Sequence, residues 1–390
     1  MKKAIILLAL FISFKAGAQS ASASSVLQNA DSLYEIGDYS NAIKHYKKVT
    51  MDAAIATKIA KAYVAIGNIP KALHYYEQAI SETNPPGKER KGDIQLQFEY
   101  AKLLGQSLKY QKADNIFKNL TNEFPSNPNF IYQRALLKEA QNDSTAIEAY
   151  REVYRLDTNH INAAYKIARN YIENRRFLDA EIYINKGLAV DSSSVRFLTL
   201  RGLKQFHTKD CPAAIATYQR LSALGESNIQ IHENLAFCYS YTNQFEKALE
   251  EYKILLNKFD DKNPKWHLEV AKVYRSLKEY EEAQRHINIA IALQEIPLSD
   301  MYLEMASIYN WKQDYKKEME ALKAAFRNNP LNEMALYKLA VAADNYFADK
   351  KTVLLYYQNY LKQFSENGRM RNLAKQRVSD LKKELHFATD

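Results

Sequence analysis

The chain has 390 residues, of which 47% are hydrophobic and 25% are charged, and its formal net charge is +9. It has only 10 glycines but 28 tyrosines, a composition typical of an ordered, largely helical chain and not of a low-complexity one. The positive charge is spread along the sequence without a basic block, so it does not indicate a nucleic-acid-binding protein.

The N-terminus has the pattern of a secretory signal. Two lysines precede the apolar run Ala4–Phe14, and small residues follow it up to Ala18. Signal peptidase removes peptides of this kind, and the run is too short for a stable membrane anchor. We therefore expect a signal peptide over 1–18, cleaved near Ala18, and a flexible leader over 19–25. The mature protein would be periplasmic or secreted, and the alternative is a buried N-terminal helix.

The residues that follow repeat one pattern about ten times, and His232–Leu256 shows it most clearly. Apolar side chains recur there at intervals of three and four residues, which places them on one face of an α-helix. Thr242-Asn243-Gln244 interrupts the pattern and predicts a tight turn. The segment therefore predicts a hairpin of two short helices. The first carries Leu235, Ala236 and Tyr239, and the second carries Phe245, Ala248, Leu249, Tyr252 and Leu256.

In chain order, the copies share small and bulky apolar residues at matching places in the second predicted helix. They are marked by Ala42 and Tyr46, Ala72 and Tyr76, Ala113 and Phe117, Ala146 and Tyr150, Ala180 and Ile184, Ala214 and Tyr218, Ala248 and Tyr252, Tyr280 and Ala283, Tyr315 and Leu322, and Tyr356 and Tyr357. A chain of this length would ordinarily divide into two or three globular domains, yet no stretch has the composition of a linker. We therefore expect one continuous repeat array, because each helix alone is too short to be stable in water.

These residues resemble the tetratricopeptide repeat, a helical hairpin with a period of about 34 residues, and the resemblance covers Val26–Phe364. It implies an all-α fold, a right-handed superhelical solenoid of about ten hairpins over residues 26–367. Two features depart from the family pattern. Glu318 stands where the ninth copy should have alanine, so we expect looser packing there. The enlarged loop Ser81–Asp93 is either a surface insertion or a contact loop.

Residues 368–390 follow the last copy. A solenoid needs its final apolar face covered, and a helix that is polar on its outer side does this. Lysine and arginine residues of this segment lie off its apolar stripe, so we expect a capping helix with a short tail. The stripe consists of Met370, Leu373, Ala374, Leu381 and Leu385.

No group of residues predicts catalysis, a metal or a cofactor. His232-Glu233 begins like the helix of a zinc protease, but Ala236 stands where the second histidine is required. The eight histidines are scattered without metal-ligand spacing. We therefore expect a protein that is not an enzyme and that binds no metal or cofactor.

Cys211 and Cys238 are the only cysteines. Cys211 opens the second helix of the sixth copy, and Cys238 lies late in the first helix of the seventh, so the two can meet where these helices pack together. In an oxidising compartment they would suit a disulfide. The alternative is a pair of small buried thiols.

In repeats of this family, the first helices line a concave groove that binds extended peptides or partner helices. The resemblance therefore implies a protein-binding face made of first-helix residues off the packing stripe, where aromatic and arginine side chains suit recognition. These residues are Tyr132, Tyr165, Arg169, Phe206, His207, Glu233, Tyr241, Lys272, Arg275, Asn310, Trp311 and Tyr337. We expect substitution of Trp311 and Arg275 to weaken binding without lowering thermal stability.

The repeat and the export signal together predict a non-enzymatic scaffold for protein–protein interaction in the bacterial cell envelope. It would bind a protein or peptide in the groove, with no nucleic-acid partner and no transmembrane segment in the mature chain. The alternatives are a module that binds an envelope glycan such as peptidoglycan through the groove aromatics, and a regulatory subunit of an envelope assembly. The sequence leaves the identity of the partner and the oligomeric state open.

Overall fold

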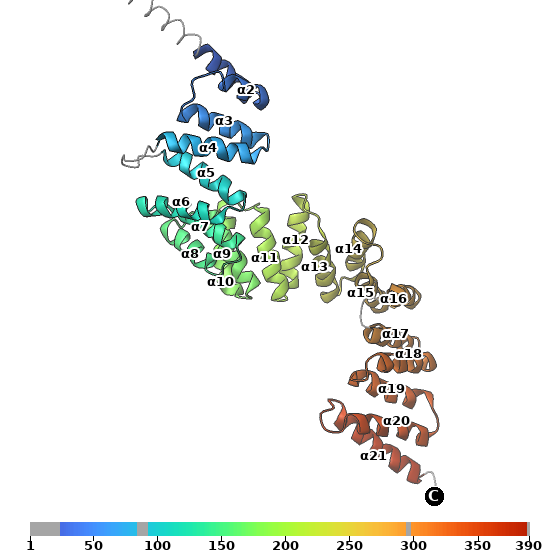
Figure 1. Cartoon of the computed structure of the whole chain (residues 1–390). Coiled ribbons are helices and arrows are strands. Elements are labelled where there is room, and N and C mark those ends of the chain that lie inside the picture. The colour runs from blue at the N-terminus through green and yellow to red at the C-terminus, as the bar shows by residue number, and fades with distance from the viewer. Residues whose placement is uncertain (1–23, 84–92, 294–297, 388–390) are drawn as a thin grey trace, which may run out of the picture. The chain divides into compact units, whose positions relative to one another are not determined.

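In the computed structural model of the chain, which describes residues 24–83, 93–293 and 298–387, every regular element is an α-helix (Figure 1). The predicted all-α helical repeat is therefore confirmed. The chain forms two compact units, one ending at Val190 and the other beginning at Asp191. The handedness of the predicted superhelix stays a prediction.

The first unit begins with a helix over residues 24–35. The helices that follow are α2 (Tyr39–Tyr46), α3 (Ala53–Ala65), α4 (Ile69–Thr83), α5 (Ile94–Gln106), α6 (Tyr110–Glu123), α7 (Pro128–Ala140), α8 (Ala146–Leu156), α9 (Ile161–Glu173) and α10 (Phe177–Val190).

The second unit contains five further hairpins and one final helix. Its helices are α11 (Val195–His207), α12 (Cys211–Ala223), α13 (Ile229–Tyr241), α14 (Phe245–Lys258), α15 (Pro264–Ser276), α16 (Tyr280–Leu293), α17 (Leu298–Trp311), α18 (Tyr315–Asn328), α19 (Glu333–Tyr346), α20 (Lys350–Gln363) and α21 (Arg371–Phe387).

Three predicted segments fall wholly or partly outside the described residues. The expected signal peptide, 1–18, is one of them, and of the leader, 19–25, only Ser24 and Ser25 are described, both in the first helix. The enlarged loop is shorter than predicted, because α4 continues to Thr83 and Asp93 caps α5. The Asp93 carboxylate accepts hydrogen bonds from the Gln95 and Leu96 backbone N–H groups in the first turn of α5. Within the described ranges, no helix has the length and apolar character needed to cross a membrane.

Within each unit, the two helices of a hairpin pack on each other, and the second helix packs on the first helix of the next hairpin (Figure 1). Alanine at the crossing allows a close approach, as at Ala72 and Ala248, which are both fully buried. Tyrosine and phenylalanine one turn further on, such as Tyr76 and Phe117, fill the space between neighbouring helices. The amphipathic pattern of the sequence is therefore satisfied by stacking and not by a central globular core.

The turn inside nine of the hairpins contains one residue with positive φ. Two are glycines, Gly37 and Gly67, which adopt this left-handed conformation without a steric penalty. The other seven carry side chains, and they are Leu108, Asn142, Arg175, Lys209, Asn243, Lys278 and Gln313. Each turn ends with a backbone hydrogen bond back to the first helix, such as Lys109 N–H to the Leu104 carbonyl at 2.9 Å.

Helix α21 packs on α20 at the end of the second unit, as a cap would. Ala374 and Leu381 are fully buried in the cluster that contains Tyr357 and Tyr360. Arg377 binds both carboxylate oxygens of Asp344 on α19, at 2.6 and 2.9 Å. The predicted stripe is wrong at Leu373, which is 59% exposed, because the helix turns its Ala374 and Leu381 side inward.

Candidate functional site

Four of the predicted binding residues line one pocket of the second unit, with a volume of about 520 Å³. We call it the α17–α19 pocket, because most of its walls come from these two first helices. Its lining consists of Arg275 from α15, Ala306, Ser307, Asn310 and Trp311 from α17, Glu318 from α18, and Met334, Tyr337, Lys338 and Val341 from α19.

Glu318 is the buried acid of the α17–α19 pocket, with only 5% of its surface exposed. The Asn310 side-chain amide donates hydrogen bonds to both of its carboxylate oxygens, at 3.1 and 3.0 Å. Burial raises the pKa of the Glu318 carboxyl, while the Asn310 hydrogen bond and the charge of Lys338 oppose this rise. The expectation of looser packing at Glu318 is not supported, because α18 packs closely on α17 and the Glu318 side chain is buried between them and the pocket.

Arg275 is already engaged at the edge of the pocket, where its guanidinium forms an ion pair with Glu304. Glu304 is almost completely buried, so this arginine neutralises a charge that would otherwise be left in the protein interior. The expectation that substitution of Arg275 leaves thermal stability unchanged is therefore not supported. Removing its side chain would strand the Glu304 carboxylate, at a cost of about 1–3 kcal/mol.

The two aromatic residues of the pocket differ in their surroundings. Trp311 lines the pocket and is 58% exposed, so more than half of its surface is open to solvent. Tyr337 is half-buried, and its ring packs edge-on against Tyr360 at 5.5 Å between centroids. Trp311 is therefore the residue with surface to offer a partner, and Tyr337 is held by α20, the second helix of its own hairpin.

A second group of aromatic side chains lies on α11 and α13, and we call Phe206, Phe237 and Tyr241 the aromatic ladder. The Phe237 and Tyr241 rings stack at 6.1 Å with an interplanar angle of 17°, and Phe206 meets Phe237 edge-on at 5.2 Å. Phe237 and Tyr241 are both exposed. The sequence pattern predicted Phe206 and Tyr241 as binding residues but not Phe237. Phe237 meets the same criterion, because it is an aromatic residue off the packing stripe of Leu235, Ala236 and Tyr239.

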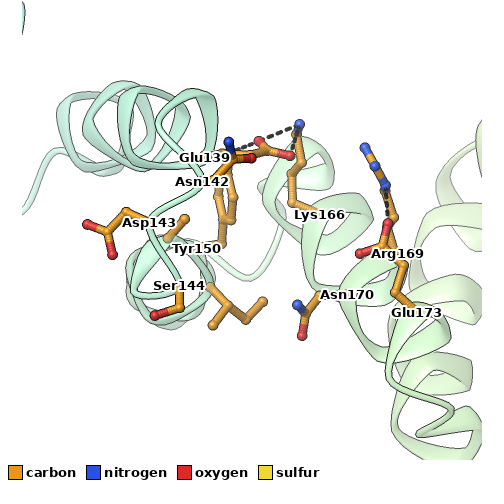
Figure 2. Close-up of a pocket in the computed structure, with 11 residues that line it drawn as sticks. Glu139, Asn142, Asp143, Ser144, Tyr150, Lys166, Arg169, Asn170 and Glu173 are labelled. Atoms are coloured by element: carbon orange, nitrogen blue, oxygen red, sulfur yellow. Dashed lines mark hydrogen bonds and ion pairs between the residues drawn. The ribbon is translucent and has the colours of Figure 1, made fainter. Parts of the chain in front are cut away.

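In the first unit, Arg169 lines a different pocket, of about 350 Å³, between α7 and α9 (Figure 2). Glu139 also lines this pocket, and it accepts hydrogen bonds from the Lys166 ammonium at 2.7 Å and from the Tyr150 hydroxyl at 2.5 Å. Burial opposes ionisation of Glu139, but these two hydrogen bonds outweigh it and hold its pKa below the usual value. Figure 2 shows Arg169 turned toward Glu173, with which it forms an ion pair of 2.8 Å.

The same arrangement recurs at the start of the chain. Asp31 accepts from the Tyr46 hydroxyl at 2.7 Å and from the Lys58 ammonium at 2.6 Å, and the three residues line a smaller pocket. In both places, an acid on the first helix of a hairpin accepts two hydrogen bonds. One comes from a tyrosine on the second helix of that hairpin, and the other comes from a lysine on the first helix of the next hairpin. These triads therefore serve as polar links between successive hairpins.

The other predicted residues are dispersed, and several serve packing. Tyr132 packs against the Tyr150 and His160 rings, and Glu233 accepts a hydrogen bond of 2.6 Å from the Trp266 indole. Lys272 pairs with Glu269 on its own helix at 2.7 Å. Tyr165 is half-buried on α9, and His207 is exposed at the end of α11, where its ring meets Phe206.

Cys211 and Cys238 are both free and fully buried in this structure. Burial raises the pKa of the Cys238 thiol, and the neighbouring Cys211 raises it further. The two cysteines therefore meet where α12 and α13 pack together, as the repeat pattern predicts, but as thiols. Across the described ranges, no group of three or more histidine, cysteine or acidic side chains is placed to hold a metal ion.

The tetratricopeptide repeat family matches residues 165–229, from within α9 to the first residue of α13. Among solved structures, the chain is similar to a tetratricopeptide repeat protein from Parabacteroides merdae, at 15% identity and a TM-score of 0.44, over 66% of this chain and 98% of that one. It is similar to yeast Tom70 at 12% identity and a TM-score of 0.40, over 95% and 98% of the two chains.

A third similar structure is YrrB, described as a tetratricopeptide repeat protein with an unusual peptide-binding site. It has 16% identity and a TM-score of 0.44, over 49% of this chain and 98% of that one. No curated protein matches the chain.

Proposed function

We propose that the protein is a non-enzymatic scaffold that binds a protein or peptide partner through the α17–α19 pocket. The observation that carries the proposal is the convergence of Arg275, Asn310, Trp311 and Tyr337, predicted from the sequence as recognition residues, on one pocket of about 520 Å³. Pockets of this size that combine exposed aromatic and polar side chains are typical of ligand sites. Trp311 is the anchor, because its indole has both apolar surface and a hydrogen-bond donor to offer.

We further propose that the scaffold works in the bacterial cell envelope, outside the cytoplasm. The basic start, the apolar run Ala4–Phe14 and the small residues after it support export. Fractionation of cells that produce the full chain tests this. A mature form shortened by about the length of the predicted signal peptide, found outside the cytoplasm, is expected. A full-length cytoplasmic protein would refute export.

Site-specific crosslinking tests the binding role. A photoreactive aromatic amino acid, which keeps a ring at the anchor position, replaces Trp311 in the full chain. The same amino acid replaces Leu355 as the matched control, since Leu355 is an exposed residue of the second helix α20 in the same unit. We expect one protein or peptide to crosslink stoichiometrically at position 311 and not at 355. Unlabelled wild-type protein should suppress the crosslink, but the W311A variant should not. Equal labelling at both positions would reject the pocket as the binding site.

The aromatic ladder favours a second candidate, the binding of an envelope glycan. Sugar rings stack on exposed aromatic faces, and Phe237 and Tyr241 present two such faces on α13. Sedimentation with purified peptidoglycan separates this function from the first. If the protein sediments with peptidoglycan and the F237A variant does not, a glycan-binding function is supported. If the wild-type protein stays in the supernatant, glycan binding is rejected and the scaffold function remains.

A further inference from the structure

Glu318 occupies a position where the other hairpins place an alanine or another apolar residue. It lies three residues after the start of α18, where seven other hairpins have a buried alanine and α20 has Val353. The alanines are Ala42, Ala72, Ala113, Ala180, Ala214, Ala248 and Ala283. In the remaining hairpin, the buried Ala146 of α8 stands four residues before Tyr150, as Ala42 stands before Tyr46. Glu318 therefore places a charged side chain where the repeat has an apolar one, and this side chain lines a pocket.

The carboxylate of Glu318 has only a neutral partner. Its hydrogen bonds come from the Asn310 amide, and no ion pair to Glu318 occurs among the described residues. Of the two cations in the lining, Arg275 is engaged with Glu304. Lys338 lies close enough to lower the pKa of Glu318 but makes no ion pair with it. A buried carboxylate without a matching cation is costly, and a cation from a ligand would relieve that cost.

The rest of the pocket suits the side chain that would carry such a cation. Trp311 lines the same pocket as Glu318 and is largely exposed, and guanidinium and ammonium groups are attracted to aromatic faces. Met334 and Val341 offer apolar contact to an aliphatic stem. An acid, an exposed aromatic face and an apolar wall are together complementary to arginine or lysine.

We propose that the α17–α19 pocket recognises a basic side chain of the partner, with Glu318 as its counter-charge and Trp311 as its stacking surface. The inference rests on the proposed scaffold function and specifies the chemistry of the partner, a peptide segment with an accessible arginine or lysine. Asn310 is a positioning residue, since it holds the carboxylate through its amide.

The test uses small probes and the two tryptophans as reporters. Trp266 is only 4% exposed, so changes in tryptophan emission on titration report mainly on Trp311. N-acetyl-arginine methylamide is titrated against the mature protein, and N-acetyl-citrulline methylamide, which has nearly the same shape without the charge, is titrated in parallel. We expect the arginine probe to bind at least ten times more tightly. Equal binding of the two probes, or tighter binding of N-acetyl-glutamate methylamide, would overturn the proposal.

Variants of Glu318 separate recognition from folding. E318Q keeps the shape and loses the charge, E318A restores the residue of the repeat pattern, and E320Q removes an exposed charge from the same helix as a control. We expect both Glu318 variants to fold and to lose the preference for arginine over citrulline, while E320Q keeps it. An arginine preference that survives in E318Q would overturn the proposal.

Crosslinking distinguishes the failure of this inference from the failure of the scaffold function. A partner that crosslinks at position 311 equally well in the E318Q background would leave the scaffold intact and reject Glu318 as a counter-charge. Loss of that crosslink in E318Q, but not in E320Q, supports both.

Discussion

Single residues of the hairpin turns differ in how well they tolerate the backbone conformation imposed on them. Glycine at 37 and 67 adopts positive φ freely, but Leu108 has φ of 61°. A left-handed conformation costs an L-residue with a Cβ atom about 1 kcal/mol or more. Leu108 offsets little of this cost by burial, since it is 72% exposed. It is therefore a strained residue whose side chain contributes little packing.

We predict that L108G raises the free energy of unfolding by about 0.5–1 kcal/mol, because glycine relieves the strain without loss of a buried contact. Urea denaturation followed by circular dichroism measures the change. L355G is the matched control, because Leu355 is also highly exposed but lies inside α20. There glycine should lower stability by about 1 kcal/mol. A destabilised L108G would show that the turn does not hold its residue under strain.

A second prediction at this scale concerns the pH dependence set by Glu318. Because its pKa is raised in the folded state, the folded protein binds this proton more tightly than the unfolded chain does. Ionisation of Glu318 therefore lowers stability as the pH rises from the ordinary glutamate value of 4.5 through the raised folded value. E318Q should be more stable than wild type at pH 7, with the difference shrinking toward pH 4. Thermal melts of both proteins from pH 4 to 8 give this difference. A constant difference would show that the charge carries no penalty.

At the scale of elements, the sequence predicts the helices well and their turns and outer faces less well. Three-and-four spacing, as in Leu235, Ala236 and Tyr239, depends only on which side chains avoid water, so it is readable from one chain. The positive φ of Lys209 or Gln313 is imposed by the hairpin and leaves no mark on residue type. The spacing also does not tell which side of the last helix faces its neighbour, and Leu373 faces out where the stripe predicted it inside.

The packing of α12 on α13 leads to a prediction about the reactivity of the two cysteines. Both thiols are buried and free, and burial raises the pKa of Cys238, so the thiolate needed for reaction is scarce in the folded protein. We expect a thiol reagent to label neither cysteine in the native state at pH 7.5. In denaturant without reductant, two thiols should react per chain. If none react until a reductant is added, a disulfide is present in solution.

At the scale of the whole molecule, the sequence does not predict the contacts of the site that join one hairpin to the next. Arg275, Asn310, Trp311 and Tyr337 could be placed on one face because helical periodicity defines that face. Glu233 could not be recognised as the acceptor for Trp266, since that contact joins α13 to α15 and depends on how the hairpins stack. In the sequence, Glu318 is only a departure from the repeat pattern. Its place in the pocket depends on how α17 and α19 pack around it.

This stacking also predicts how the molecule responds to damage at one end. Each hairpin contacts mainly its neighbours, so stability is approximately a sum of local terms, and a local change should stay local. Tyr360 is fully buried, and its hydroxyl donates a hydrogen bond of 2.6 Å to Glu333, which also accepts one of 3.0 Å from the Met370 N–H. Y360F keeps the ring and removes the hydroxyl, so the contact of α20 with the start of α19 and α21 should lose about 1 kcal/mol.

We expect hydrogen exchange, measured by mass spectrometry, to become several-fold faster in α19–α21 of Y360F and to remain unchanged in α3–α8. Y346F is the matched control, because Tyr346 is an exposed residue at the end of α19 and should leave exchange in α19–α21 near the wild-type rate. Faster exchange throughout the chain in Y360F would mean that the molecule unfolds as a single cooperative body. In that case nearest-neighbour stacking would not be sufficient to describe its energetics.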